Sequence, residues 1–270
     1  MIVLAAQRAG TTNPLADAHG VSHKCLIPVA GETLIARTLA SVSSHPGCRA
    51  VHILIEPDGE LAVRPIAESF ATEELPIEFI VSDSNIAGSV LRGCDNGTAP
   101  FVITTADNVL ISHDSMNRVL RAMDTGADAV AALANKDDIR AVHPAAQRFF
   151  YEFRDHGYAN CNLYGLAGEQ ALNAVEIFRE GGQFMNHPRR LVNAFGLFNI
   201  LLMRLGWVSI DRAFERLSKR FGITMRRVAL SDGTQAIDVD NERTYRIVGR
   251  FWKIVSSSLK YDCLNRNVRI

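Results

Sequence analysis

Met1-Ile2-Val3-Leu4-Ala5-Ala6 opens the chain, and a polar segment over residues 7–23 follows it before Lys24. The apolar run leaves no polar position to alternate, which is typical of a strand buried on both faces of a parallel sheet. A chain that leaves such a strand emerges at the carboxyl edge of the sheet, where open α/β sheets bind their ligands. The opening therefore predicts an α/β fold with a ligand site near Lys24.

The segment over residues 7–23 contains glycines and small polar residues, whose backbone amides can approach a phosphate group closely. Lys24 adds a full positive charge to it. The segment is neither a P-loop nor a dinucleotide fingerprint, because no Gly-Lys-Ser/Thr triplet occurs and Gly10 lacks partner glycines at the required spacing. A phosphate-binding loop is one interpretation, and an ordinary polar surface loop is the other.

Apolar runs alternate with helix-like segments through the first half of the chain. Strands are expected at 2–6, 51–55, 77–81, 101–105 and 127–133, and helices at 33–43, up to 70, 87–93 and 112–125. This alternation predicts a three-layer, doubly wound, mostly parallel sheet. In the second half we expect a hairpin of 148–153 and 160–166, helices at 168–180, 188–204 and 209–221, strands at 224–230 and 235–239, and a last helix at 242–257.

Composition bounds the class of protein. The chain has 270 residues, of which 47% are hydrophobic and 21% charged, so it can build a sizeable core. We expect a single domain over residues 1–270, elaborated at about 140–222 for binding an acceptor. A formal net charge of zero gives no electrostatic case for a nucleic-acid partner. Nothing in the sequence predicts an oligomeric state.

Five cysteines without paired spacing argue against a disulfide framework or a zinc site and favour the cytoplasm, and the N-terminus has no signal-peptide pattern. The most apolar stretch, 191–210, contains Asn193, Asn199 and Arg204. These polar residues favour a buried or interface-lying helix over a transmembrane segment. Contact of its apolar face with a lipid or a lipid-like acceptor stays open.

Acidic residues lie at or just after the ends of two of the predicted strands. Asp107 comes just after strand 101–105, and Asp238 and Asp240 share one side of the predicted strand 235–239 and its end. Carboxylates at the ligand edge of a sheet are the hard oxygen donors that a divalent cation bridging phosphates needs. The alternative is a turn cap for Asp107 and an N-cap of the last helix for Asp238 or Asp240.

Together these segments resemble the nucleotidyltransferase superfamily of GT-A fold, nearest to its molybdenum-cofactor cytidylyltransferase-like branch of MobA-like NTP transferases. The resemblance rests on Leu4-Ala5-Ala6, on residues 24–35, on Thr105-Ala106-Asp107 and on Asp238-Val239-Asp240, and it covers the first 135 residues best. The first loop departs from the family pattern, Leu-Ala-Gly/Ala-Gly-x-Gly-x-Arg. Gln7 and Ala9 replace glycines there, while Arg8 and Gly10 remain.

The resemblance implies transfer of a nucleoside monophosphate group from a nucleoside triphosphate, CTP or GTP with CTP favoured, to a phosphorylated small-molecule acceptor. The reaction would use Mg²⁺ or Mn²⁺ and release pyrophosphate. By resemblance, Lys24 and Arg8 are catalytic, and Asp107 and Asp240, with Asp238 as a further candidate, hold the metal. The residues implied to bind the nucleotide are Leu4, Ala5, Ala6, Gly10, Lys24, Asn85, Gly88, Ser89, Thr105 and Asp107.

The candidates for binding the acceptor are Tyr158, Asn160, Asn162, Arg189 and Arg190. Turn or sheet-edge roles are the alternative for the first three, and a solvated surface for the arginine pair. Two other functions stay open. A glycosyltransferase of the same fold would normally show a paired acidic motif, whereas Ala106 and Asn108 flank Asp107 here. A non-catalytic nucleotide-binding protein is the other alternative, because a fold does not determine a function.

Overall fold

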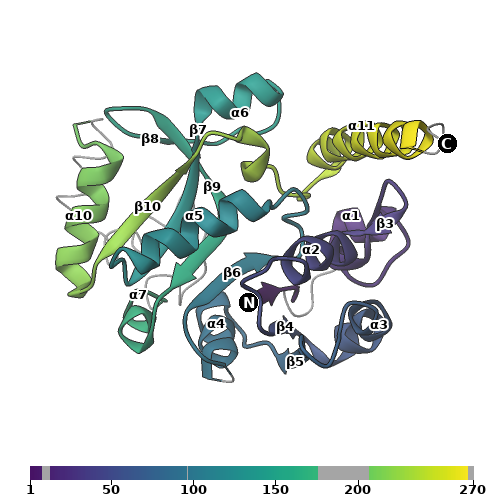
Figure 1. Cartoon of the computed structure of the whole chain (residues 1–270). Helices are drawn as coiled ribbons and strands as arrows, with labels where there is room; N and C mark the ends of the chain where they lie inside the picture. The colour runs from purple at the N-terminus through teal and green to yellow at the C-terminus, as the bar shows by residue number, and fades with distance from the viewer. Residues whose placement is uncertain (8–12, 96, 176–206, 267–270) are drawn as a thin grey trace.

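The computed structural model describes residues 1–7, 13–95, 97–175 and 207–266 (Figure 1). Within these ranges, an eight-stranded sheet runs in the order β10-β7-β9-β6-β1-β4-β5, and β8 pairs with β9. The strands are β1 (Ile2–Leu4), β4 (Val51–Ile55), β5 (Ile77–Val81), β6 (Phe101–Thr105), β7 (Ala129–Asn135), β8 (Tyr151–Glu152), β9 (Gly157–Leu166) and β10 (Met225–Leu230). A two-stranded ribbon of β2 (Pro28–Val29) and β3 (Glu32–Thr33) lies apart from the sheet.

The sheet is mostly parallel, as predicted. β1 pairs in parallel with β4 and with β6, β4 with β5, and β7 with β10. β9 is the exception, because it runs antiparallel between β6 and β7. Its pairing with β7 shifts register between Ala131 and Leu133, which bends the ladder near the ligand edge.

Helices cover both faces of this sheet (Figure 1). They are α1 (Pro14–Ala18), α2 (Leu34–Ser43), α3 (Pro57–Glu68), α4 (Ile86–Asp95), α5 (His113–Asp124), α6 (Lys136–Val142), α7 (Leu172–Val175), α10 (Ile210–Phe221) and α11 (Glu242–Arg266), with short 3₁₀ turns at Lys24–Leu26, Glu169–Ala171 and Gly233–Ala236. Helices α2, α3 and α5 pack into one hydrophobic cluster, and α4 and α7 into a second.

The two clusters meet the sheet from opposite sides. In β1, Val3 belongs to the first cluster and Ile2 to the second, and neither side chain is exposed. Both faces of the opening strand are therefore buried, which explains its unbroken apolar sequence. The prediction of a three-layer α/β fold is confirmed.

Two segments differ from the sequence expectations because hydrogen bonds of individual side chains determine their conformation. The polar segment after β1 contains α1, which Asn13 caps by accepting hydrogen bonds from the amides of Leu15 (2.9 Å) and Ala16 (3.3 Å). The predicted strand 235–239 was wrong. A 3₁₀ turn replaces its start, and Gln235 bonds the carbonyl of Leu110 (2.7 Å) and the amide of Ser112 (3.1 Å) instead of a strand ladder.

In the second half, the predicted hairpin is confirmed as β8 and β9, although β8 is only two residues long. The structure adds α6, which was not predicted. The expected helix at 188–204 and most of the apolar stretch 191–210 lie outside the described residues. Within the described ranges, no helix combines the length and the apolar character needed to cross a bilayer.

Candidate active site

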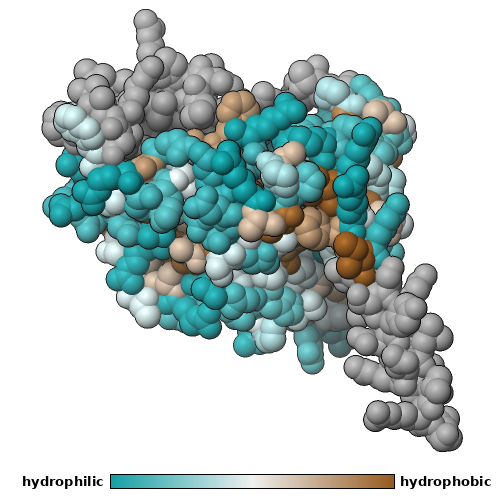
Figure 2. Space-filling view, turned by 90° about the horizontal axis from the view of Figure 1, so that it is seen from above, coloured by the Kyte–Doolittle hydropathy of each residue, from teal (hydrophilic) through white to brown (hydrophobic). Residues whose placement is uncertain are grey.

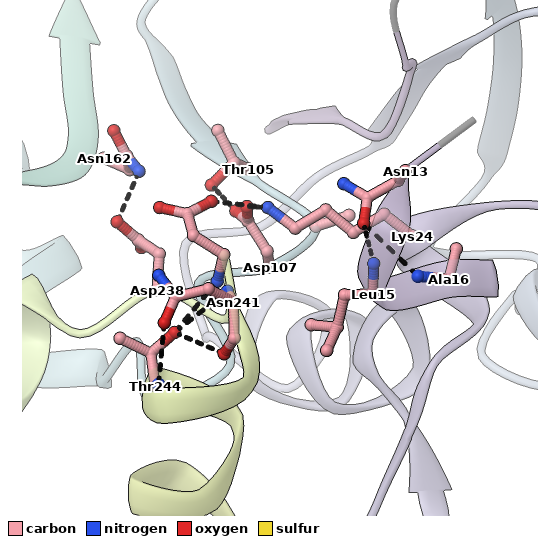
Figure 3. Close-up of polar contacts among 12 residues, drawn as sticks. Asn13, Leu15, Ala16, Lys24, Thr105, Asp107, Asn162, Asp238, Asn241 and Thr244 are labelled. Carbon is pink, nitrogen blue, oxygen red and sulfur yellow. Dashed lines mark hydrogen bonds and ion pairs between the residues drawn. The ribbon is translucent and has the colours of Figure 1, made fainter. Parts of the chain in front are cut away.

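Lys24 is the centre of a charged cluster at the carboxyl edge of the sheet (Figure 3). Its ammonium group donates to the carboxylates of Asp107 and Asp240, and the distance from Nζ to Oδ1 of Asp240 is 2.6 Å. Burial lowers the pKa of Lys24, but the two carboxylates outweigh burial and hold that pKa above its usual value. The cation predicted from the first loop and the acids predicted after two distant segments therefore meet at one point.

Asp107 lies two residues beyond the end of β6. The hydroxyl of Thr105 donates to its Oδ1, while Lys24 donates to its Oδ2. Burial raises the pKa of Asp107, and the charge and hydrogen bond of Lys24 reverse that effect, so its pKa lies below the ordinary carboxyl value. The group is therefore an anion, oriented by Thr105.

Asp238 is buried, with 9% of its surface exposed. Its Oδ2 accepts a hydrogen bond of 2.6 Å from the side-chain amide of Asn162, and its Oδ1 has no hydrogen-bond partner among the described residues. Burial first, and then the charges of Asp107 and Asp240, raise its pKa well above the ordinary carboxyl value. Around Asp238, negative charge in the cluster thus exceeds positive charge.

Asp240 is not the cap of the last helix. Thr244 accepts hydrogen bonds through Oγ1 from the amides of Asp240 (3.1 Å) and Asn241 (3.3 Å), and Asn241 accepts one from the amide of Thr244 (3.3 Å). Asn241 and Thr244 therefore close the start of α11 (Figure 3). This cap leaves the carboxylate of Asp240 directed at Lys24.

The donor chemistry of this cluster fits a hard divalent cation, since carboxylate oxygens and an unpartnered buried oxygen gather at one place. In the part of the chain that the structure describes, no group of three His, Cys, Asp or Glu side chains is arranged to hold a metal ion by itself. Mg²⁺ commonly takes one or two carboxylates and completes its shell with phosphate oxygens and water. The arrangement therefore suits a cation that arrives with a phosphate ligand.

Asn160 and Asn162 lie beside this cluster, as predicted for one side of β9. Asn160 donates through Nδ2 to Oδ1 of Asn162 (2.9 Å) and to the hydroxyl of Tyr164. The backbone of Asn162 has a φ of +45°, a left-handed conformation that asparagine tolerates better than most residues. Asn162 thereby reaches Asp238, so the two asparagines connect β9 to the acidic residues.

Tyr158, also predicted to bind the acceptor, has a structural role. It is 4% exposed, and its hydroxyl donates to Oδ2 of Asp155 (2.7 Å). The other carboxylate oxygen of Asp155 accepts from the amide of Ile210 (3.1 Å), at the start of α10. Tyr158 thus ties the hairpin to α10.

Asn85, Gly88 and Ser89, predicted to line the nucleobase, form the start of α4. Asn85 accepts from the amide of Gly88 (2.8 Å), and the hydroxyl of Ser89 accepts from the amide of Asp83 (2.8 Å). A Cβ on Gly88 would lie 2.6 Å from the side chain of Asp83, so only glycine fits there. These contacts give the three residues a role in holding the start of α4.

The remaining predicted residues fall into two groups. Leu4 is partly buried in β1, and the amides of Ala5 and Ala6 both donate to the carbonyl of Leu54, at 2.9 and 3.1 Å. These two amides are therefore bonded to β4 and do not point at a ligand. Arg8, Gly10, Arg189 and Arg190 lie outside the described residues.

Sequence reasoning missed Glu56, which contacts both Gln7 and His23, near the two ends of the polar segment between β1 and Lys24. Its carboxylate accepts from the amide of Gln7 at 3.2 and 3.3 Å and lies 3.2 Å from Nε2 of the buried His23. Glu56 directly follows a buried strand, as Asp107 nearly does. An acidic residue after a strand was the signal that could have identified it.

The family model of the MobA-like NTP transferase domain matches residues 1–175. The chain belongs to this family. The match covers β1, Lys24 and Asp107, and it ends before the segment that carries Asp238 and Asp240. Family membership supports the prediction of a nucleotidyltransferase enzyme.

A curated relative, the 2-C-methyl-D-erythritol 4-phosphate cytidylyltransferase of Gloeobacter violaceus, is 28% identical over 129 residues. This match covers 47% of the chain and 55% of the relative, so the chain spans about half the length of the curated relative it matches. The similarity therefore concerns part of each protein.

Solved structures share the fold over nearly the whole chain. A hypothetical transferase from Thermus thermophilus is similar with a TM-score of 0.69 and 18% identity, over 91% of this chain and all of that one. The 4-diphosphocytidyl-2C-methyl-D-erythritol synthase from Anaerococcus prevotii follows with a TM-score of 0.58 and 11% identity, over 93% of this chain and 96% of that one. The similarity in fold thus extends well beyond residue 175.

Proposed function

We propose that this protein is a metal-dependent nucleotidyltransferase that uses a nucleoside triphosphate and a phosphorylated small-molecule acceptor. The observation that carries the proposal is the position of Lys24 between the carboxylates of Asp107 and Asp240. An ammonium group held by two acids is poised to exchange these partners for a triphosphate that brings its own cation. Family membership supports the same reaction class.

The reaction is an in-line substitution at the α-phosphorus. An oxygen of the acceptor's phosphate forms a bond to that phosphorus, while the bond from the α-phosphorus to the oxygen bridging it to the β-phosphate breaks. The electron pair of the broken bond leaves with pyrophosphate. Because the attacking phosphate is already an anion, the protein needs to position the two reactants and to offset their charge rather than supply a general base.

The residues of the cluster would have different roles in positioning the reactants and offsetting their charge. Lys24 would contact an oxygen of the α-phosphate, where negative charge gathers in the transition state. Asp107 and Asp240, with Asp238 behind them, would hold Mg²⁺ or Mn²⁺, which supplies further neutralisation of phosphate charge when bound. Thr105 and Asn162 fix the orientation of two of these carboxylates through their hydrogen bonds.

CTP is the donor we favour over GTP. The support is the similarity to a relative that is named as a cytidylyltransferase. The start of α4 does not favour either base, because the polar side chains of Asn85 and Ser89 are bonded within that helix start. Selection of the base would then fall to backbone groups and neighbouring residues.

The test is an assay for pyrophosphate release with each of the four triphosphates, Mg²⁺ and a panel of phosphomonoesters that includes 2-C-methyl-D-erythritol 4-phosphate. We expect release with CTP that depends on one class of phosphomonoester. Lys24→Ala should lower the rate by roughly a hundredfold to a thousandfold. Lys219→Ala, an exposed lysine in the last turn of α10, is the matched control.

Release of pyrophosphate at equal rates by the wild type and Lys24→Ala would contradict the role of Lys24. If no triphosphate reacted with any phosphomonoester and a nucleotide sugar were consumed instead, the proposal would fail in favour of a glycosyltransferase.

A further inference from the structure

Arg243 connects the acidic cluster to the segment that follows α6. It lies in the first turn of α11, three residues after Asp240. Its Nη1 donates to the carbonyl oxygen of Ala145 and, at 2.9 Å, to that of Ala146. The segment around residue 145 is thereby held against the start of α11, close to the residues that would receive the triphosphate.

Arg148 follows on the same segment and has an exposed side chain. Among the described residues, its guanidinium group makes no ion pair or hydrogen bond. Burial lowers the pKa of Arg243, and the charge of Arg148 lowers it further, while Asp240 acts in the opposite direction. Arg148 lies two residues after Ala146, whose carbonyl oxygen accepts from Arg243, and Arg243 lies three residues after Asp240, so the chain itself places the three residues near one another.

Two other cations of this region, Lys136 and Arg140, already have partners. Lys136 bonds Glu152 at 2.6 Å, and the guanidinium of Arg140 lies 5.7 Å from the centre of the Phe150 ring. Figure 2 looks down on the side of the molecule where α6 lies, and hydrophilic residues cover most of that face. The exposed Arg148 and the half-buried Arg243 thus form a positive group near Asp240.

We propose that Arg148 and Arg243 bind the phosphate group of the acceptor. The inference rests on the proposed function and names the residues that would recognise its second substrate. A guanidinium group presents planar, paired donors that match phosphate oxygens, and two of them can balance a phosphate dianion. Their position next to Asp240 brings such a phosphate to the triphosphate side of the cluster, where one of its oxygens must attack.

The position also explains why two like charges are held together. In the absence of an anion the two guanidinium groups repel each other, and hydrogen bonds to the carbonyls of Ala145 and Ala146 hold Arg243 in place. An acceptor phosphate would turn this repulsion into two attractive contacts. Arg148 lies on the segment that the sequence assigns to acceptor binding, at about 140–222, whereas Arg243 lies beyond it in α11, and neither belongs to the predicted arginine pair.

Calorimetric titration of the full chain with glycerol 3-phosphate and with glycerol, in the absence of triphosphate and metal, tests this site. We expect saturable binding of glycerol 3-phosphate and no binding of glycerol. Arg148→Gln should weaken the binding roughly tenfold to a hundredfold, as should Arg243→Gln. Arg212→Gln, which removes an exposed arginine from the first turn of α10, should leave it unchanged.

A second readout separates this site from the proposed reaction. In the pyrophosphate assay, Arg148→Gln should raise the KM for the phosphomonoester and leave the stabilisation by triphosphate and Mg²⁺ unchanged. Equal binding of glycerol 3-phosphate by the wild type and Arg148→Gln, or no binding by the wild type, would overturn the inference. Arginine-dependent phosphate binding without any nucleotidyl transfer would overturn the proposed function and leave the anion site standing.

Discussion

At the scale of single residues, Lys24 occupies the position between Asp107 and Asp240 where positive charge is needed. Removing it leaves two carboxylates facing each other without a counter-charge, and one of them is largely buried. In the wild type, part of the binding energy of a metal–triphosphate complex must be spent on displacing the ammonium group of Lys24 from the two carboxylates. In the nucleotide-free protein the ammonium group of Lys24 lies between the two carboxylates, and in the nucleotide-bound protein the metal ion would take that place.

Lys24→Ala should therefore lower the stability of the nucleotide-free protein by about 1–3 kcal/mol. Mg²⁺ alone should restore part of this loss, because the cation can take the place of the ammonium group, whereas it should stabilise the wild type less. Thermal unfolding of both proteins with Mg²⁺ and with chelator measures the difference. An equal effect of Mg²⁺ on the two proteins would show that the acids do not share a cation.

Asp238 gives a prediction on pH. Its pKa in the folded protein is raised, so folding favours its protonated form. Its contribution to stability is greatest below the ordinary carboxyl pKa and is lost as the pH rises through the raised value. Asp238→Asn, which cannot ionise, should therefore gain stability over the wild type as the pH increases.

Urea unfolding of both proteins across this pH range checks the prediction, with Asp137→Asn on the exposed side of α6 as the control. The same Asp238→Asn protein should bind triphosphate with Mg²⁺ more weakly. A stability difference between the two proteins that stays constant as the pH rises would contradict this account of the buried carboxyl group.

At the scale of elements, the bounds of three strands could be predicted to the residue. β4, β5 and β6 have the predicted bounds because each is a short run rich in β-branched and aromatic residues, which favour a strand. Elements built on local polar contacts were missed. α1 depends on the side chain of Asn13, and the segment after β10 follows the hydrogen bonds of Gln235 to another loop.

The carboxylate of Asp155 contributes to the contact between the β8–β9 hairpin and α10, beside the apolar packing of Phe153 and Tyr158 against Ile210. Burial acts to raise the pKa of Asp155, but the hydrogen bonds from Tyr158, from the amide of Ile210 and from nearby backbone amides together outweigh burial and lower that pKa. Asp155→Asn should destabilise the protein by about 1 kcal/mol at neutral pH, a modest effect because the group is exposed.

The pH dependence of this variant has the opposite sign to that of Asp238→Asn. A lowered folded-state pKa means that the stabilisation is present above the ordinary carboxyl pKa and is lost as the pH falls through the folded value. The difference between wild type and Asp155→Asn should thus shrink in acid. Chemical unfolding at neutral and acid pH measures it, and Tyr158→Phe isolates the share of the hydroxyl. A difference that grew in acid would rule out this role for Asp155.

At the scale of the whole molecule, the strand order decides which residues meet. β6 lies next to β1, so Asp107 comes beside Lys24, and the chain after β10 returns across the sheet edge to place Asp240 against both. The sequence could predict the first pairing from the rule that parallel strands share one ligand edge. The sequence also indicated that Asp240 could join Asp107, because it follows an apolar segment just before the last helix. The proximity of Arg148 and Arg243 depends on tertiary packing, for which the sequence carried no local signal.

The most direct test of the central claim is thermal unfolding of the protein with each of the four nucleoside triphosphates, with Mg²⁺ and with chelator. A triphosphate at about a hundred times its Kd should stabilise the folded state by roughly 2.7 kcal/mol, which is several degrees in Tm for a chain of this size. We predict a Mg²⁺-dependent shift that is largest with CTP and is lost in Asp107→Asn. The absence of a shift with every triphosphate, or a shift that survives in Asp107→Asn, would contradict the account.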